Sequence, residues 1–589
     1  MFFKRFLHFL AILIIVCVFI SACAPRAKVV PTIPPATSTA QINKPPIAVV
    51  TVTPSLTEVH IGEAVPSFLR EQAAAWEIPA NSYLSFDVST SPFTGEETHL
   101  QWVYALVAPF PTILDGVTSD ELKSAWRDGT PPAAFDGKPL LMDESTLAAF
   151  TALWGEPASG FVRSVPAGEL LDTAWMELPS WAIIPFESLQ PKWKVLTVDG
   201  QSPIRKGFDL SSYTLVVPFS LRTSSDLPPS SFVVPLSNYD PSKMTTIIMT
   251  GVTALVRATA LTMELKGVAY PGERIRDVML EADIAHISNE IPFFTGCPYP
   301  KPDQAALVFC SDPKYIELFT DIGADVIELT GNHFADRGAQ GMIETIEIYK
   351  ANKLPYFGGG IDREDSIKPA LFESNGNKIA FIGCNRPDTG KFPTATADRP
   401  GAAPCDFTYL KEKIAQLKAD GYIVISTFQW NESYDFKPNI LQVQDFRLMV
   451  DAGADIVSGS QAHYAQSMEF YNNSFIHYGL GNLFFDQMGD QSWMPKDIRR
   501  EFLDRYVIYD GRLIGIELLT AMLEDYARPR WMTGQERANF LQDYFYYSGW
   551  LPFQPTPEPT ITPTLTPLPI PPLAGTPEWI PSNTPGPSP

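Results

Sequence analysis

An apolar segment that runs directly into Gly-Asn-His constrains the fold of this chain more than any other feature. Residues 325–329 have the length and apolar content of a strand, and Gly331 permits a sharp turn at its end. Asn332 and His333 follow at the position where open α/β sheets present their ligands, beyond the carboxyl end of a strand. The sequence therefore predicts an α/β sheet with a functional edge near His333.

The segment 244–486 repeats this pattern of apolar strand, polar strand end and helix. Helices with an apolar face, such as the one expected over residues 341–350, connect several of the strands. Strands that alternate with helices indicate a layered α/β domain whose polar residues gather at the strand ends. Those ends carry Gly251, Asn289-Glu290, residues 429–432, residues 460–463 and Asn482.

The order of these motifs resembles the CapA proteins of capsule synthesis, including poly-γ-glutamate capsules, whose fold is similar to that of calcineurin-type metallophosphoesterases. The resemblance implies an α/β fold: a layered β-sandwich flanked by helices. The motifs that carry it are Gly251 with Arg257, Asn289-Glu290, Asn332-His333 with Asp336, residues 429–432, residues 459–463 and residues 478–482.

Three positions depart from the family pattern. Val252 lies where the family has its first aspartate, and Gln429 and Gln461 lie where it has histidines. A two-metal hydrolytic centre needs hard carboxylate and imidazole ligands around both ions. Because valine has no lone pair and a glutamine carbonyl is a weak neutral ligand, we expect at most one metal ion and weakened or lost catalysis.

The residues that remain define a candidate site by resemblance. The resemblance implies either one divalent metal ion, of unknown identity, or no ion. The candidate ligands of such an ion are Glu290, Asn332, His333 and His463. Glu432, as general acid or base, and His333 are the candidate catalytic residues. The candidate substrate-binding residues are Arg257, Asn289 and Asn482.

Two further histidines have mainly structural interpretations. His286 shares a strand face with Ser288 and Glu290 and is therefore a candidate auxiliary ligand. His477 lies within an apolar strand and is expected to be a hydrogen-bonded core residue.

The amino terminus has the features of a bacterial export signal. Lys4 and Arg5 precede an apolar run over residues 6–20, and small residues precede Cys23. This pattern also resembles a lipobox, so we expect a signal peptide over residues 1–23, lipidation of Cys23 and a Pro/Thr-rich tether over residues 24–55. The alternative is an uncleaved anchor. The protein is thus expected outside the cytoplasm, anchored to the bacterial cell membrane as a lipoprotein.

Four cysteines lie beyond the signal, an even number that suggests disulfides in an exported protein. Three pairings are formally possible. Sequence proximity favours Cys297 with Cys310 and Cys384 with Cys405.

The rest of the chain divides into three further parts. Residues 56–238 mix predicted strands and helices, which indicates a smaller α/β or α+β domain, and residues 181–202 resemble one lobe of periplasmic solute-binding proteins. The CapA-like domain is expected over residues 244–550 with a helical extension at its end. Residues 551–589 are Pro/Thr-rich and predict a disordered tail.

The overall charge excludes one class of partner. The chain carries a formal net charge of −22, which argues against nucleic acid binding. The same long-range field repels a polyanionic substrate. Arg257 and Arg337 near the strand ends can still hold a carboxylate by a bidentate hydrogen bond.

Two functional classes follow. The first is a metal-dependent hydrolase or transferase that acts on a γ-glutamyl amide or phosphoester bond. The second is a non-catalytic, ligand-binding surface protein that kept the fold and the cleft. In both, the expected partners are the membrane, through the lipid anchor, and a surface polymer or the capsule-synthesis machinery. The replacements at 252, 429 and 461 favour the second class or a weakened form of the first.

Overall fold

The computed structural model of this chain describes residues 58–79, 82–89, 96–224, 232–386, 394–489 and 497–552. The predicted signal peptide, the lipidation site Cys23, the tether and nearly all of the Pro/Thr-rich tail lie outside these residues. No helix within the described ranges has the length and apolar character needed to cross a membrane.

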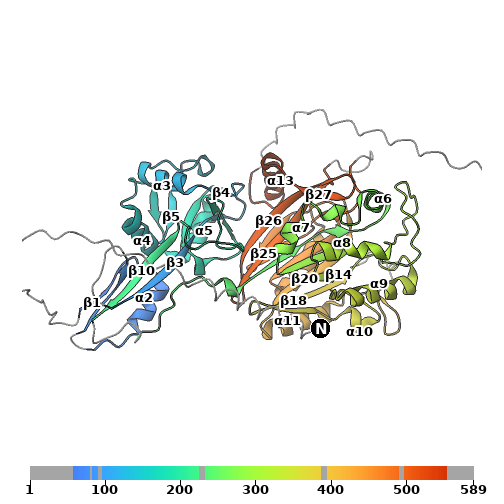
Figure 1. Cartoon of the computed structure of the whole chain (residues 1–589), viewed down its shortest axis with the longest axis horizontal. Helices are drawn as coiled ribbons and strands as arrows, with labels where there is room; N and C mark the ends of the chain where they lie inside the picture. The colour runs from blue at the N-terminus through green and yellow to red at the C-terminus, as the bar shows by residue number, and fades with distance from the viewer. Residues whose placement is uncertain are drawn as a thin grey trace, which may run out of the picture. The chain divides into compact units, whose positions relative to one another are not determined.

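The amino-terminal lobe, residues 58–238, is built on one mixed sheet, which confirms the expected mixture of strands and helices (Figure 1). The sheet has the order β1-β2-β10-β3-β7-β5-β6, and β8 also pairs with β3. A capping box begins the helix at Ser119: the Thr118 side chain accepts from the Glu121 backbone N–H, and the Glu121 side chain accepts from that of Thr118. The bounds are β1 Glu58–Ile61, β2 Tyr83–Val88, β3 Glu96–Pro109, β5 Leu140–Met142, β6 Val162–Ser164, β7 Trp181–Pro185, β8 Trp193–Val195, β10 Val216–Thr223, α2 Ser67–Ala74, α3 Ser119–Asp128, α4 Glu144–Trp154 and α5 Leu170–Met176, with the short parallel pair β4 Gly116–Val117 and β9 Thr197–Val198.

The carboxy-terminal lobe, residues 244–552, contains two large sheets. The first has the order β15-β14-β13-β11-β25-β26-β27, with β12 between β13 and β24. Its bounds are β11 Met244–Met249, β12 Val252–Thr253, β13 Ile284–Asn289, β14 Val326–Glu328, β15 Tyr356–Phe357, β24 Asn482–Phe484, β25 Arg500–Tyr509, β26 Arg512–Glu524 and β27 Arg528–Trp531. The second has the order β17-β18-β20-β21-β23-β22, with bounds β17 Ala370–Ser374, β18 Asn377–Asn385, β20 Ile423–Ser433, β21 Ile456–Ala462, β22 Met468–Tyr471 and β23 Ser474–His477.

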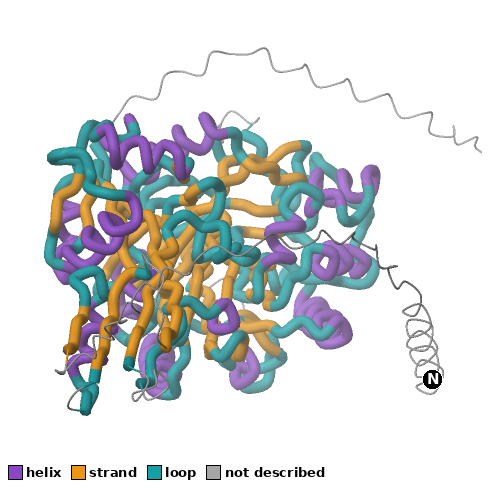
Figure 2. Tube along the Cα trace, turned by 60° about the vertical axis from the view of Figure 1, so that its left-hand side comes forward, coloured by secondary structure: helices purple, strands orange, loops and turns teal. Residues whose placement is uncertain are grey.

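The two sheets pack face to face because their side chains alternate between the two sheet faces. Ile247 and Met249 join Ile379 and Phe381 in the core between the sheets, whereas Ile248 faces the helices. Helices α6 Arg257–Lys266, α7 Arg276–Glu281, α8 Ile316–Asp321 and α9 Gly338–Asn352 cover the first sheet, and α11 Phe407–Ala419 and α12 Ile440–Asp451 cover the second. Figure 2 shows helices around the strands. The expected sandwich flanked by helices is confirmed.

The end of this lobe contains strands before the helix that the sequence predicts. Strands β25, β26 and β27 extend the first sheet, and only then does α13 Gly534–Tyr547 follow. The short α10 Arg363–Ser366 and the pair β16 Gly359–Gly360 and β19 Gly401–Ala402 complete the lobe. Both predicted disulfides, Cys297–Cys310 and Cys384–Cys405, are present.

The two lobes belong to one compact unit and share an interface. Phe110 of the amino-terminal lobe is buried against Phe470, Phe475, Phe545 and Trp550, with ring centroids 5.2 to 6.2 Å apart. That the amino-terminal domain folds by itself, as its separate motif content suggests, stays a prediction.

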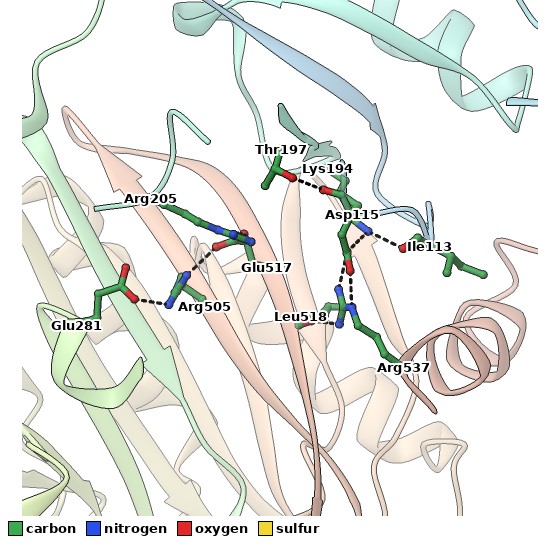
Figure 3. A network of polar contacts seen from close by, with 10 residues as sticks. All are labelled: Ile113, Asp115, Lys194, Thr197, Arg205, Glu281, Arg505, Glu517, Leu518 and Arg537. Atoms are coloured by element: carbon green, nitrogen blue, oxygen red, sulfur yellow. Dashed lines mark hydrogen bonds and ion pairs between the residues drawn. The ribbon is translucent and has the colours of Figure 1, made fainter. Parts of the chain in front are cut away.

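A polar network also connects the two lobes (Figure 3). Asp115 accepts from Arg537 at 2.8 Å and from Lys194 at 2.8 Å, and Glu517 accepts from Arg205 at 2.6 Å and from Arg505 at 3.1 Å. Burial lowers the pKa of Lys194 to about 8 despite the neighbouring carboxylate. Burial would raise the pKa of Glu517, but the two guanidinium groups outweigh it and lower that pKa.

Candidate functional site

Four of the predicted metal-binding and catalytic residues line one cavity of about 820 Å³: Glu290, His333, Glu432 and His463. Glu290 follows β13, His333 lies beyond β14, Glu432 is near the end of β20 and His463 follows β21. Within each sheet the two strands are parallel neighbours, so their carboxyl ends share an edge. The structure thus brings these four residues, from strands of both sheets, to one cavity.

Glycines allow the strand ends to approach so closely. A Cβ atom at Gly331 would lie 2.3 Å from the carbonyl oxygen of Glu290, and one at Gly251 would lie 2.0 Å from that of Gly481. Both distances are far below van der Waals contact. If either glycine were replaced, the two backbone segments that meet at that glycine would have to separate.

His333 is held by a carboxylate behind it. Its Nδ1 lies 2.8 Å from Oδ2 of Asp336, which also accepts from the backbone N–H of Phe309 at 2.7 Å. Burial lowers the pKa of His333, but the hydrogen bond to Asp336 and the charges of Glu290 and Glu432 outweigh it and raise that pKa. Donation from Nδ1 leaves Nε2 as the nitrogen available to the cavity.

A chain of hydrogen bonds connects His463 to Glu432. His463 Nδ1 lies 2.9 Å from Asn482 Oδ1, and Asn482 Nδ2 donates to Gln487 at 3.0 Å. Gln487 donates to the Tyr434 hydroxyl at 3.0 Å, and that hydroxyl donates to Glu432 at 2.7 Å. Asn482 thus orients His463 instead of lining the cavity, where the sequence had placed it as a substrate-binding residue. Tyr434 and Gln487 belong to no predicted motif, and no local pattern distinguishes them.

The other two predicted substrate-binding residues are engaged by the protein. Asn289 donates to the carbonyl of Ile291 and to the Tyr349 hydroxyl, both at 2.7 Å, and does not line the cavity. Arg257 lines the cavity, but its guanidinium forms a fork with the carboxylate of Asp486. Its charge is therefore already compensated.

The replaced family positions carry hydrogen bonds in place of anionic or imidazole ligands. Gln429 Nε2 donates to Asn332 Oδ1 at 3.0 Å, so the amide oxygen predicted to bind a metal already accepts a hydrogen bond. Gln461 Nε2 lies 3.5 Å from Glu290 Oε1, and the backbone at Gln461 has a φ of +71°. The side chain of Val252 is 1% exposed and offers no ligand atom.

These contacts do not fit a two-metal centre. Such a centre needs lone pairs directed at the ions, and here two amide N–H groups point at Asn332 and Glu290. Within the described residues no group of three or more His, Cys, Asp or Glu side chains is arranged to hold a metal ion.

The other two histidines of the carboxy-terminal lobe lie in the core of the sandwich. His286 Nε2 is 3.2 Å from the carboxylate of Glu328, and both side chains are almost fully buried. His477 Nδ1 is 2.6 Å from Asp504, which also accepts from Tyr506 at 3.0 Å. Neither histidine lines the cavity.

The charges that line the cavity are mainly negative. Asp486 is compensated by Arg257, whereas Glu290 and Glu432 have no ion pair with any described lysine or arginine. The interior is thus suited to a cationic group.

Comparison with known proteins identifies the lobe that carries this cavity. Residues 246–487 match the family described as "Bacterial capsule synthesis protein PGA_cap". This segment belongs to that capsule synthesis family. The PGA_cap match contains every predicted metal-binding, catalytic and substrate-binding residue, and every residue that lines the cavity except Tyr526.

Three curated relatives are similar to the PGA_cap segment. "PGA biosynthesis protein CapA" of Bacillus subtilis (strain 168) is 34% identical over 178 residues, which are 30% of this chain and 47% of that protein. "Capsule biosynthesis protein CapA" of Bacillus anthracis is 28% identical over 252 residues, 38% of this chain and 60% of that protein. A "Probable polyglutamine synthesis accessory protein" of Mycobacterium tuberculosis (strain CDC 1551 / Oshkosh) is 24% identical over 229 residues, 37% of this chain and 60% of that protein. The chain thus spans about half to three fifths of the length of these relatives.

Proposed function

We propose that this protein is an accessory component in the synthesis of an extracellular poly-γ-glutamate-type polymer, and that its cavity binds the polymer without two-metal catalysis. The resemblance of the PGA_cap segment to capsule and polyglutamine synthesis proteins supports the biological setting. The predicted signal and Cys23 support a lipoprotein on the outer side of a bacterial membrane.

One observation supports polymer binding over two-metal catalysis as the role of this cavity. The amide of Gln429 donates to Asn332, and the amide of Gln461 points at Glu290, so the side chains that would have to coordinate metals are bonded to one another. The carboxylates of Glu290 and Glu432, which have no described lysine or arginine partner, then face the cavity. A γ-linked glutamate chain carries one ammonium group, at its amino end, and this group complements both carboxylates.

Elemental analysis and metal titration of the purified exported part test this proposal. We expect no more than one weakly bound divalent ion per chain and no hydrolysis of a phosphoester or γ-glutamyl substrate. The matched variant combines Val252→Asp, Gln429→His and Gln461→His, which restores the family's ligand types. It should gain metal affinity that the natural chain lacks. Two tightly bound ions in the natural chain, together with robust hydrolysis, would overturn the proposal.

A specific observation also favours a single-ion enzyme as the second candidate. His333 and His463 both line the cavity, and both have Nδ1 engaged by Asp336 or Asn482, which leaves Nε2 available. These histidines with Glu290 would hold one ion, which would polarise a carbonyl or phosphoryl oxygen, and Glu432 would move the proton. Turnover that requires one ion per chain and is lost in the His333→Ala and His463→Ala variants would establish this candidate.

A further inference from the structure

A second cavity of about 250 Å³ adjoins the site cavity. The two cavities share Arg257, Gln304 and Phe309 as lining residues. The smaller one lies between α6, the loop closed by the Cys297–Cys310 disulfide and Arg337, the residue that precedes α9. The two cavities therefore lie next to each other, with these three side chains at their common boundary.

Arg337 lines this second cavity with an uncompensated charge. Its side chain makes no hydrogen bond and no ion pair with any residue that the structure describes, and its Nε is buried without a partner. Arg500 and Arg528 also have a buried Nε without a partner, but their terminal nitrogens are paired with carboxylates. A buried guanidinium nitrogen without a partner is costly, and a carboxylate with two oxygens is its best complement.

The other basic groups of this cavity are already paired. Lys314 Nζ lies 2.6 Å from the carboxylate of Glu264, and Arg257 is bound to Asp486. Asp312 also lines the cavity; its Oδ1 accepts from the backbone N–H of Lys314 at 3.0 Å, and it forms no ion pair with a described residue. Among the described residues that line this cavity, Arg337 is thus the basic residue without an anionic partner. Asp312 lies in the same cavity and would repel an anionic ligand.

We propose that Arg337 forms a carboxylate subsite that binds an α-carboxylate of the γ-glutamyl polymer, while the polymer's amino end lies beside Glu290 and Glu432. This inference rests on the proposed function and deepens it. A γ-linkage leaves every α-carboxylate free, so the residues that follow the amino end present anions to the adjoining cavity. The two cavities, one acidic and one with an unpaired guanidinium, therefore match a chain end with an ammonium followed by carboxylates.

Calorimetric titration with a γ-linked glutamate pentamer tests the subsite on the full exported chain. A second titration uses the same pentamer with its α-carboxylates amidated. In the natural protein we expect the amidated pentamer to bind about ten-fold more weakly, since one charge-assisted hydrogen-bond pair is lost. Arg337→Gln should bind the acidic pentamer about ten-fold more weakly than the natural protein and should no longer distinguish the two ligands. Asp312→Asn, which keeps the acceptor for the Lys314 N–H, should bind the acidic pentamer more tightly.

Arg274→Gln is the matched control, because Arg274 is exposed and does not line either cavity. It should bind both pentamers as the natural protein does. If Arg337→Gln has an unchanged melting temperature and still prefers the acidic pentamer, the subsite is wrong and the proposed function stands. If the natural protein binds neither pentamer, both the proposed function and the subsite are wrong.

Discussion

Replacing Phe110 with alanine should uncouple the two lobes. The Phe110 side chain is 3% exposed and its ring contacts four aromatic rings of the carboxy-terminal lobe, three of them edge to face. Burial of such a ring is worth about 1.5–3 kcal/mol in transfer free energy. The cavity and the lost aromatic pairs bring the expected loss in the free energy of unfolding to about 3–5 kcal/mol.

Differential scanning calorimetry separates loss of coupling from general damage. The natural protein should unfold in one main transition, and Phe110→Ala should resolve it into two. Phe135→Ala is the matched control, because Phe135 is fully buried within the amino-terminal lobe and stacks on Trp181 with ring centroids 4.7 Å apart. It should destabilise the protein by a similar amount without separating the transitions. A loss below about 1 kcal/mol for Phe110→Ala, with one transition retained, would refute the reasoning.

The remaining predictions concern the anchor, a disulfide and acid stability. Cys23→Ser should release the protein from membranes or block its processing, as fractionation and mass spectrometry of the amino terminus would report; unchanged retention and processing would contradict the lipoprotein assignment. Cys297→Ser should lower the free energy of unfolding in urea by about 3 kcal/mol, since the bond to Cys310 closes a 13-residue separation, and an unchanged midpoint would argue against that estimate. Glu517 has a lowered folded-state pKa, so its stabilisation is present above its ordinary value of 4.5 and is lost as the pH falls through the lower folded value. Glu517→Gln should therefore lose less stability between pH 7 and pH 3 than the natural protein, and equal losses in acid unfolding experiments would contradict this assignment.

Much of the site was predictable because local sequence determines where strands end. Apolar runs fix β13, β14, β20 and β21, and parallel neighbours must present their carboxyl ends at one edge. Glu290 and His333 therefore lie at one edge of the first sheet, and Glu432 and His463 lie at one edge of the second. That these two edges meet at one cavity depends on how the sheets pack. The disulfide pairs followed from sequence proximity in the same way.

Tertiary structure alone decided which of these side chains are available. Arg257 and Asp486 are 229 positions apart, and their pairing removes an arginine that the motif had offered to a substrate. Arg337 belongs to no motif that would favour it over Arg257 as the arginine that binds a carboxylate. Its side chain nevertheless has no partner among the described residues. Strand β25 pairs with β11, and β26 and β27 follow it in the first sheet. The chain between β11 and β25 contains strands of both sheets, so this pairing joins distant parts of the sequence. Periodicity reports which face of an element is apolar, but a polar side chain's partner depends on what the fold brings opposite it, and that information is non-local.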